Sequence, residues 1–262
     1  MYRFLAVTRV AFKLFGLDIY WYGIVMCTAI VVAIAVACLY AKRKKYGTDL
    51  PLNIAFVILP FGILSARLFA VLFDSSLELS DYFNFRTGGL SVIGSIIGGG
   101  VALLVYLLIK REKNPFKYFD TLCVVLILAM AIGRWGNFFN SEVYGQIIPT
   151  SSYFARFPFA VEIDGIYFQA LFFYESCLSL LGFVILSIIY FKVKQTGYVS
   201  AIYMIYYGVV RTILEPLRQE QYILKMFGLP VSQICSIIMI VIGVSILIYA
   251  IIKSVKVRKV NG

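Results

Sequence analysis

Residues 20–41 read YWYGIVMCTAIVVAIAVACLYA, and the basic run Lys42-Arg43-Lys44-Lys45 follows directly. The stretch contains no charged residue. A helix rises about 1.5 Å per residue, so about 20 apolar residues span the hydrocarbon core of a bilayer. The stretch therefore predicts a transmembrane helix that ends in a basic cluster at a membrane surface.

Six further apolar blocks follow along the chain. They lie at residues 50–74, 89–109, 121–140, 168–191, 198–216 and 229–252. Hydrophobic residues make up 61% of the 262 residues and charged residues 14%, and mean hydropathy is +0.90. Soluble domains carry roughly 25% charged residues. We therefore expect an all-α, polytopic integral membrane protein with about seven transmembrane helices, built as a single membrane-embedded domain over residues 1–262.

The basic residues predict the orientation of these helices. Fourteen lysines and arginines follow the first, third, fifth and seventh blocks, and seven lie on the other side. Positive charge accumulates on the cytoplasmic side of membrane proteins. The N-terminus is then expected outside and the C-terminus in the cytoplasm. The net charge of +11 is therefore explained by basic residues placed on one side of the lipid bilayer. We expect no nucleic-acid partner.

The segments outside the blocks are short. Residues 1–19 alternate apolar and basic side chains, from which we expect a helix lying at the membrane interface. Residues 141–167 are expected to form a small extracytoplasmic head loop, with a hairpin around residues 159–164. Residues 75–88 are expected to form a second external loop.

Glycines crowd the start of the third block. The spacing of Gly94 and Gly98 is typical of helices in close contact, and we expect close packing for residues 98–100. Two alternatives stay open for Gly88 and Gly89: close packing, or backbone amides that face a lipid head group.

The chain has no histidine, and its five cysteines all lie inside apolar blocks without metal-ligand spacing. Histidine is the commonest metal ligand and a frequent general base. We therefore expect no metal site.

Charged residues within the apolar blocks are the strongest functional signal, because charge inside a bilayer is costly and usually functional. With the predicted orientation, all of them lie toward the extracytoplasmic side: Arg67, Arg134, Glu175, Arg211 and Glu215. Tyr22, Asn137, Asn140 and Glu142 fall at the same depth. Arginine binds phosphate in a bidentate manner, so this group predicts a site for a phospholipid head group. The alternatives are that Arg211 and Glu215 only neutralise one another, and that Arg67 extends to the interface.

Residues 133–145, GRWGNFFNSEVYG, closely resemble the signature of bacterial phosphatidylglycerol–prolipoprotein diacylglyceryl transferases. That signature is Gly-Arg-x-Gly-Asn-x-x-Asn-x-Glu-x-x-Gly. Further similarities follow in family order: Tyr20-Trp21-Tyr22-Gly23, Ala66-Arg67 with Val71-Leu72-Phe73, Gly88-Gly89-Leu90-Ser91, Tyr174-Glu175, and Arg211 to Glu215 with Arg218. Two places differ. Ile93 stands where members commonly carry histidine, and Gln169-Ala170 stands where they carry His-Pro.

The resemblance implies an enzyme of the bacterial plasma membrane with its active site on the extracytoplasmic side. Members transfer the sn-1,2-diacylglyceryl group of phosphatidylglycerol to the lipobox cysteine thiol beside the signal peptide of a prolipoprotein. They release glycerol 1-phosphate and use no cofactor.

The resemblance also implies roles for individual residues. The catalytic candidates are Arg134, Arg211, Glu142, Glu215 and Tyr22. The candidates for phosphatidylglycerol binding are Arg134, Asn137, Asn140, Arg67, Gly88, Gly89 and Gly145. Arg134 and Arg211 are expected to contact the phosphate, with Asn137 donating a hydrogen bond. Glu142 and Glu215 are expected to orient arginines or to help deprotonate the thiol. Tyr22 is expected to bind the head group or to relay a proton.

Three alternatives remain at this level. One is a divergent relative with another acceptor, and a second is a non-catalytic phospholipid-binding protein. The third is a lipid or anion transporter. Against this alternative, the charges within the predicted spans are confined to the outer half, whereas a transport path would also need polar residues in the inner half.

Overall fold

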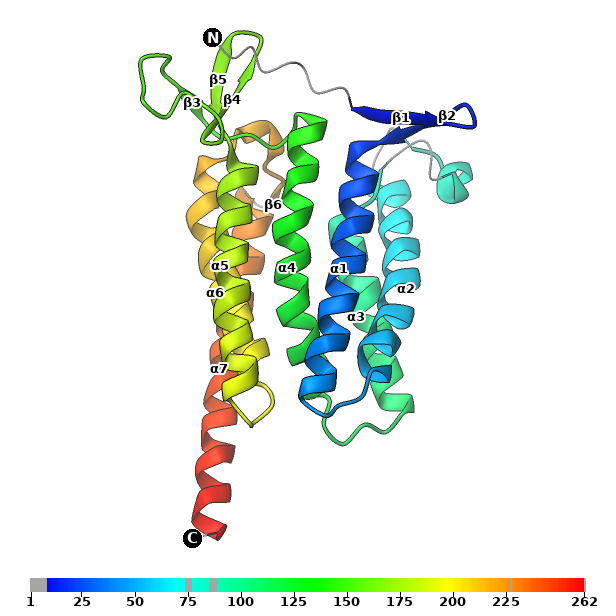
Figure 1. The fold of residues 1–262 in the computed structure, drawn as a ribbon, viewed down its shortest axis with the longest axis vertical. Helices are drawn as coiled ribbons and strands as arrows, with labels where there is room; N and C mark the ends of the chain where they lie inside the picture. Colours follow the sequence, from blue (N-terminus) through cyan, green and yellow to red (C-terminus); the bar gives the residue numbers. More distant parts are fainter. Residues whose placement is uncertain (1–8, 74–76, 85–88, 227, 262) are drawn as a thin grey trace. The chain divides into compact units, whose positions relative to one another are not determined.

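The computed structural model describes residues 9–73, 77–84, 89–226 and 228–261, with side chains to residue 252. Within these ranges the chain has seven α-helices (Figure 1). They are α1 (Trp21–Arg43), α2 (Asp49–Phe73), α3 (Val92–Ile109), α4 (Phe116–Asn140), α5 (Leu171–Lys192), α6 (Tyr198–Leu214) and α7 (Val231–Asn261). Each predicted block overlaps one of them, so the expected all-α class is confirmed.

Six of the seven described helices are long and apolar enough to cross a membrane. The other is α6, which has 17 residues. Large apolar side chains on the helices face outward, as Phe56 at 76% exposure and Leu108 at 75% illustrate. A lipid environment removes the cost that such exposure would have in water. The protein is therefore a multi-pass membrane protein, while its orientation stays a prediction.

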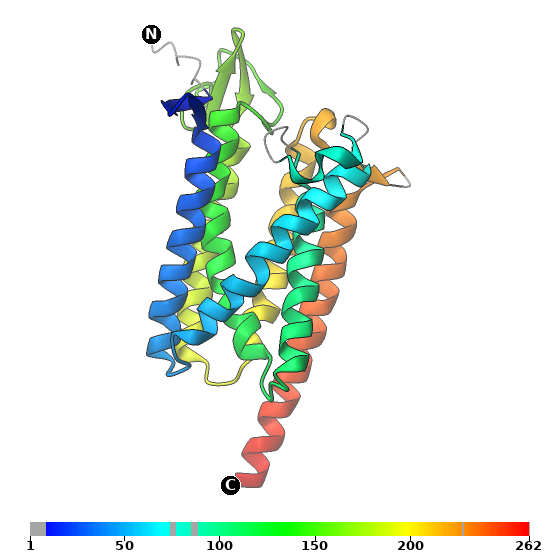
Figure 2. The same ribbon diagram turned by 90° about the vertical axis from the view of Figure 1, so that its right-hand side faces the viewer.

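The chain forms two compact units, Cys38–Tyr118 and a second made of Met1–Ala37 with Phe119–Gly262. In the first unit, α2 packs against α3 (Figure 2). A Cβ atom at Gly94 would lie 2.6 Å from the Ser65 carbonyl oxygen, and one at Gly98 would lie 2.2 Å from the Ser65 Cβ. The close packing predicted for Gly98 is confirmed, as it is for Gly99. It is wrong for Gly100, which has open space around its Cβ position. That the two units act as one domain stays a prediction.

Arg67 organises the connection between α2 and α3. Its side chain is fully buried, and its guanidinium donates to the carbonyl oxygens of Asp81, Asn84 and Gly89 at 2.7–3.1 Å. Asp81 belongs to the short 3-10 helix η1 (Leu79–Phe83). Arg67 is thus enclosed by the segment that follows α2, and its extension to the interface stays a prediction. Gly88 lies outside the described residues.

In the second unit, Asp120 of α4 caps the start of α6. Its carboxylate accepts hydrogen bonds from the backbone N–H groups of Gly197 at 2.7 Å and Ser200 at 2.8 Å, and from the Ser200 hydroxyl. The first N–H groups of a helix lack partners within it and carry partial positive charge. A carboxylate from another helix therefore fixes where α6 begins.

Residues 10–20 form a hairpin of β1 (Val10–Leu14) and β2 (Leu17–Tyr20). The interfacial helix expected there is wrong, and residues 1–8 lie outside the described ranges. Phe15 and Gly16 both have positive φ, 48° and 78°, which is the backbone of a tight two-residue turn between strands. The alternation of side chains that suggested a helix has the period of a strand.

A small sheet stands at the end of the second unit where α4 stops and α5 begins (Figure 1). It has the order β3 (Ile147–Ile148), β5 (Ile166–Gln169), β4 (Ala160–Ile163), and both pairings are antiparallel. The hairpin predicted in the head loop is confirmed in β4 and β5. A two-stranded pair, β6 (Lys225–Met226) and β7 (Leu229–Pro230), precedes α7.

Candidate active site

A network of buried charges joins α4, α5 and α6 in the second unit. The Glu175 carboxylate lies 2.5 Å from Nε of Arg134 through one oxygen and 3.1 Å from Nη1 of Arg211 through the other. Nη2 of Arg211 pairs with Glu215 on its own helix. Only 5% of the Glu175 side chain is exposed. Buried charges are stable when paired and hydrogen-bonded, so Glu175 holds one arginine from each neighbouring helix.

The two arginines differ in what they leave available. Both terminal nitrogens of Arg211 are occupied by carboxylates. In the described part of the chain, Arg134 is held only through Nε, and its two terminal nitrogens have no hydrogen-bond or ion-pair partner. Its side chain is 19% exposed. Arg134 therefore presents the guanidinium edge with its two terminal nitrogens, which suits a bidentate contact with a phosphate.

Arg218 is a third arginine of this cluster, and sequence reasoning did not include it among the site residues. Its Nε is buried without a hydrogen-bond partner in the described structure. Burial, and then the charge of Arg211, lower the pKa of its guanidinium. The charges of Glu175 and Glu215 act in the opposite direction and raise this pKa. Three arginines against two glutamates leave the cluster with one excess positive charge, which favours an anionic ligand.

The end of α4 places Glu142 beside two amides. Its Oε1 accepts hydrogen bonds from Asn137 at 3.1 Å and Asn140 at 3.3 Å. Ser141 and Val143 on either side have positive φ, 53° and 59°. This conformation is unfavourable for a β-branched residue, and such strain clusters at functional sites. The chain thus turns back so that the carboxylate meets the last turn of α4.

Glu142 is placed differently from the other two glutamates. No lysine or arginine nitrogen among the described residues lies within ion-pair distance of it, whereas Glu175 and Glu215 are both paired. Its charge contributes to the raised pKa of Tyr144, about 12, behind burial and Tyr222. Glu142 therefore contacts amides where the sequence led us to expect an arginine.

Tyr22 and Gly136 meet between α1 and α4. A Cβ atom at Gly136 would lie 2.8 Å from Cδ2 of the Tyr22 ring, so only glycine admits the ring at this distance. The signature glycine therefore lets Tyr22 pack against the turn of α4 that carries Arg134 and Asn137.

Gly145 joins the head to the chain after α6. It forms a β-bridge with Arg218, and its N–H donates to the Gln169 carbonyl at 2.9 Å. The Gln146 amide donates to the Arg218 carbonyl at 3.1 Å. A Cβ atom at Gly145 would lie 2.8 Å from the Gln169 side chain and 2.9 Å from the Leu217 carbonyl oxygen. Gly145 thus has a packing role that fixes the backbone of Arg218.

Arg67 and Gly89 lie in the other unit. Gly89 has φ of 75°, and its carbonyl accepts a hydrogen bond from Arg67 at 2.9 Å. The nitrogens of Arg67 thus hold backbone carbonyls. Its expected contact with lipid stays a prediction, as does that of Gly89.

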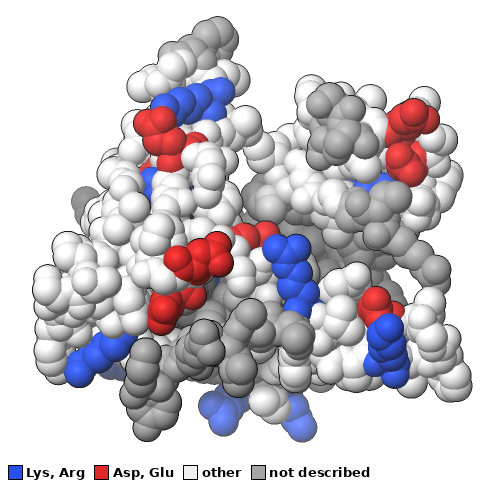
Figure 3. Space-filling view, turned by 90° about the horizontal axis from the view of Figure 1, so that it is seen from above, with Lys and Arg blue, Asp and Glu red and all other residues white. Residues whose placement is uncertain are grey.

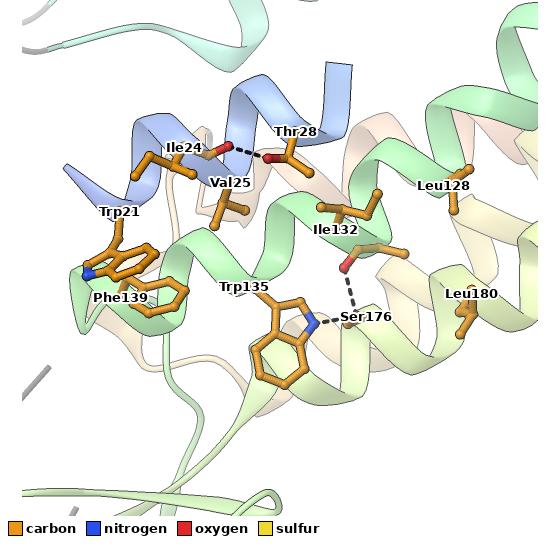
Figure 4. Close-up of a pocket in the computed structure, with 11 residues that line it drawn as sticks. Trp21, Ile24, Val25, Thr28, Leu128, Ile132, Trp135, Phe139, Ser176 and Leu180 are labelled. Atoms are coloured by element: carbon orange, nitrogen blue, oxygen red, sulfur yellow. Dashed lines mark hydrogen bonds between the residues drawn. The ribbon is translucent and has the colours of Figure 1, made fainter. Parts of the chain in front are cut away.

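An apolar groove lies between α1, α4 and α5 in the second unit (Figure 4). Its volume is about 390 Å³. Trp21 stacks on Phe139 at one end, with ring centroids 5.1 Å apart. Trp135 donates its indole N–H to the Ser176 hydroxyl, which donates to the Ala131 carbonyl. The Trp135 indole and the Ser176 hydroxyl are thus both hydrogen-bonded within the protein.

Charged side chains are sparse on the face that carries the head. Acidic and basic groups are interspersed there, and most of the visible surface carries neither (Figure 3). On the head loop, Arg156 lies over the Tyr153 ring, 3.7 Å from its centroid.

Comparison with known proteins gives one consistent result. A model of the family described as prolipoprotein diacylglyceryl transferase matches residues 9–249. The chain is 36% identical over 255 residues to the phosphatidylglycerol–prolipoprotein diacylglyceryl transferase of Clostridium novyi (strain NT), which covers 94% of this chain and 96% of that protein. Identity is also 36% over 244 residues to the same-named protein of Clostridioides difficile (strain 630), covering 92% and 94% of the two chains. It is 36% over 247 residues to that of Streptococcus pneumoniae (strain Hungary19A-6), covering 92% and 93%. The similarity thus spans both units.

Proposed function

This chain belongs to the prolipoprotein diacylglyceryl transferase family, and we propose that it transfers the diacylglyceryl group of phosphatidylglycerol to a cysteine thiol of a prolipoprotein. This membership confirms the family that residues 133–145 suggested. The acceptor is the lipobox cysteine, and the products are a thioether-linked lipoprotein and glycerol 1-phosphate. The reaction takes place at the extracytoplasmic face of the bacterial plasma membrane.

The availability of the Arg134 terminal nitrogens carries this proposal. They lie in a buried cluster with one excess positive charge, where a phosphodiester of charge −1 would restore neutrality. Low local dielectric strengthens such an interaction. Donors that are already held in place stabilise the charge that develops on the leaving phosphate.

The other charged residues divide the work. Arg134 and Arg218 contact the phosphate. Glu175 and Glu215 position the arginines. Arg211 contributes positive charge to the cluster without contacting the phosphate, whereas the sequence predicted a direct contact of Arg211 with the phosphate. Asn137 and Asn140 support Glu142. The head-group roles of Tyr22, Gly145, Arg67, Gly88 and Gly89 stay predictions.

Glu142 is the proton acceptor in this proposal. Glu175 and Glu215 are both paired with arginine, and protonating either would break an ion pair with a buried guanidinium. Glu142 holds none among the described residues, so it can take the thiol proton without breaking an ion pair. The sulfur then forms a bond to the terminal glyceryl carbon of the diacylglyceryl group. The bond from that carbon to the phosphate oxygen breaks, and its electron pair leaves with glycerol 1-phosphate.

The test is release of glycerol phosphate by purified protein supplied with phosphatidylglycerol and a lipobox peptide. Release that requires the peptide cysteine supports the transferase, and release from a cysteine-to-alanine peptide contradicts it. Arg134→Ala should strongly reduce turnover, because it removes one of the two arginines that contact the phosphate. Arg156→Ala, which removes an exposed arginine of the head loop, should leave it unchanged. Binding of phosphatidylglycerol without release by folded protein would indicate a lipid-binding protein instead.

A further inference from the structure

The side chain of Tyr144 closes the turn that carries Glu142, although the family signature leaves position 144 open. The Tyr144 hydroxyl donates a hydrogen bond to the Ser141 carbonyl oxygen at 2.5 Å. This bond joins the two residues that enclose positions 142 and 143. The backbone of Glu142 therefore lies within a small ring that a side chain completes.

The turn needs this support because its backbone is strained. Ser141 and Val143 both have positive φ, which is particularly unfavourable for a β-branched residue. Such a conformation persists only where the surrounding structure holds it. On the helix side, the N–H of Glu142 donates to the Asn137 carbonyl at 3.0 Å. On the other side, the Tyr144 hydroxyl supplies the tether.

The Tyr144 ring is itself held in place. It packs against Phe168 of β5, with 5.3 Å between ring centroids, and edge-on against Tyr222 at 5.7 Å. Tyr222 ends the short 3-10 helix η4 (Glu220–Tyr222). Burial, and then a hydrogen bond with Tyr222, raise the pKa of the Tyr144 hydroxyl to about 12. The group therefore stays protonated near neutral pH and remains able to donate to Ser141.

We propose that Tyr144 positions Glu142 for the reaction by holding the turn of residues 141–143 closed. The role of Glu142 as proton acceptor rests on the proposed function. Tyr144 acts through the backbone, because its hydroxyl proton goes to the Ser141 carbonyl. Without the hydroxyl, the strained turn relaxes and the Glu142 carboxylate loses its fixed place beside the amides of α4. A base that is not held within reach of the thiol proton is less effective.

Tyr144→Phe tests the tether, because it removes the hydroxyl and keeps the ring. We expect the turnover number with a lipobox peptide to fall about 10-fold, a part of the about 10²–10⁴-fold that a positioned base contributes. With the same peptide carrying selenocysteine, whose selenol is largely ionised and needs no base, we expect little change. The KM for phosphatidylglycerol should also change little. Tyr167→Phe is the matched control and should leave both rates unchanged, since it removes a hydroxyl that bonds to Glu162 at the surface of the head.

Two outcomes of this comparison would overturn the proposal. An equal fall with both peptides would show general damage to the site. No fall with the cysteine peptide would show that the tether has no part in the reaction.

Hydrogen exchange tests the tether without turnover. In Tyr144→Phe, the amides of Ser141 and Glu142 should exchange several-fold faster, and unchanged exchange would overturn the proposal. Val143→Asn, added to Tyr144→Phe, should restore much of the lost rate, because asparagine adopts positive φ more readily than valine. A double variant as slow as Tyr144→Phe would count against the proposal. Faster exchange in Tyr144→Phe, when the unmodified protein releases no glycerol phosphate, would refute the proposed function alone.

Discussion

Replacing Glu142 by glutamine separates proton transfer from every other task of the site. Glutamine keeps the shape of the side chain, and its amide oxygen can still accept hydrogen bonds from Asn137 and Asn140, which both reach Oε1 in the unmodified protein. A positioned general base contributes about 10²–10⁴-fold to a rate, or about 2.7–5.5 kcal/mol at 1.36 kcal/mol per decade. Since no ion pair of Glu142 is lost among the described residues, we expect the turnover number to fall by that factor and stability to stay unchanged.

The assay compares two acceptors in glycerol phosphate release. One is a lipobox peptide with cysteine, and the other is the same peptide with selenocysteine. A thiol is mostly protonated at neutral pH, whereas a selenol is largely ionised and needs no base. Glu142→Gln should therefore be slow with the cysteine peptide and close to the unmodified protein with the selenocysteine peptide. Glu162→Gln, on β4, is the control, because that carboxylate accepts a hydrogen bond from Tyr167 at the surface of the head.

Equal loss of rate with both peptides would refute the assignment of Glu142 as the base. It would show that the carboxylate acts on the structure of the site or on lipid binding, for which the nature of the nucleophile does not matter. No loss with either peptide would remove Glu142 from the mechanism. Both outcomes leave the transferase proposal intact, provided that the unmodified protein releases glycerol phosphate.

Three further predictions concern how the site is held. Glu175→Gln removes the ion pair of Arg134 and one of the two ion pairs of Arg211, so we expect a loss of about 3–5 kcal/mol in the free energy of unfolding and loss of turnover, measured by thermal unfolding in detergent and by glycerol phosphate release. Gly145→Ala should cost about 1–3 kcal/mol by overpacking and reduce turnover, because a Cβ meets Gln169 at 2.8 Å. Gly100→Ala, with open space around its Cβ position, should leave both measurements unchanged or raise stability slightly. Asp120→Ala orphans two N–H groups at the start of α6 and should lower the free energy of unfolding by about 2–4 kcal/mol; thermal unfolding with no change would contradict the capping role.

The helices could be predicted from sequence because an uncharged run of about 20 residues has few alternatives to a spanning helix. Their ends were less predictable. In the structure α4 begins at Phe116, five residues before the predicted block. The prediction began too late because Lys117 and Asp120 are polar and fell outside the hydropathy pattern. Asp120 is buried only because it caps another helix, and a partner distant in sequence leaves no local signal.

The hairpin at residues 10–20 shows a different limit. The apolar–basic alternation was interpreted as an interfacial helix, although a period of two residues is that of a strand and a surface helix has a period of about 3.6 residues. The Phe15-Gly16 turn decides in favour of the hairpin. Gly16 was the available signal, since glycine adopts positive φ without strain.

The sequence predicted the composition of the site and the pairing of Arg211 with Glu215, but not the contacts of Glu175 and Glu142. Their similar depth in the membrane predicted that Arg134, Glu175 and Arg211 lie together, and the structure places them within one network. Sequence could not show that Glu175 bridges two helices or that Glu142 contacts amides. Arg218 lies beyond the end of α6, so a search for charges within apolar blocks passed over it. Its three-residue distance from Glu215 was the signal that could have included it.

The charge arrangement also has a consequence for the reaction. Taking the thiol proton neutralises Glu142, and breaking the bond to the phosphate oxygen places a second negative charge on the leaving group. The proposed reaction therefore moves one negative charge from the end of α4, where amides hold it, to the arginine cluster, where one positive charge is in excess. Interactions that strengthen as charge develops are those that accelerate a reaction. A selenolate brings its own charge but delivers the same charge to the phosphate. Arg134→Ala should thus slow the cysteine and selenocysteine peptides equally, whereas Glu142→Gln should slow only the first.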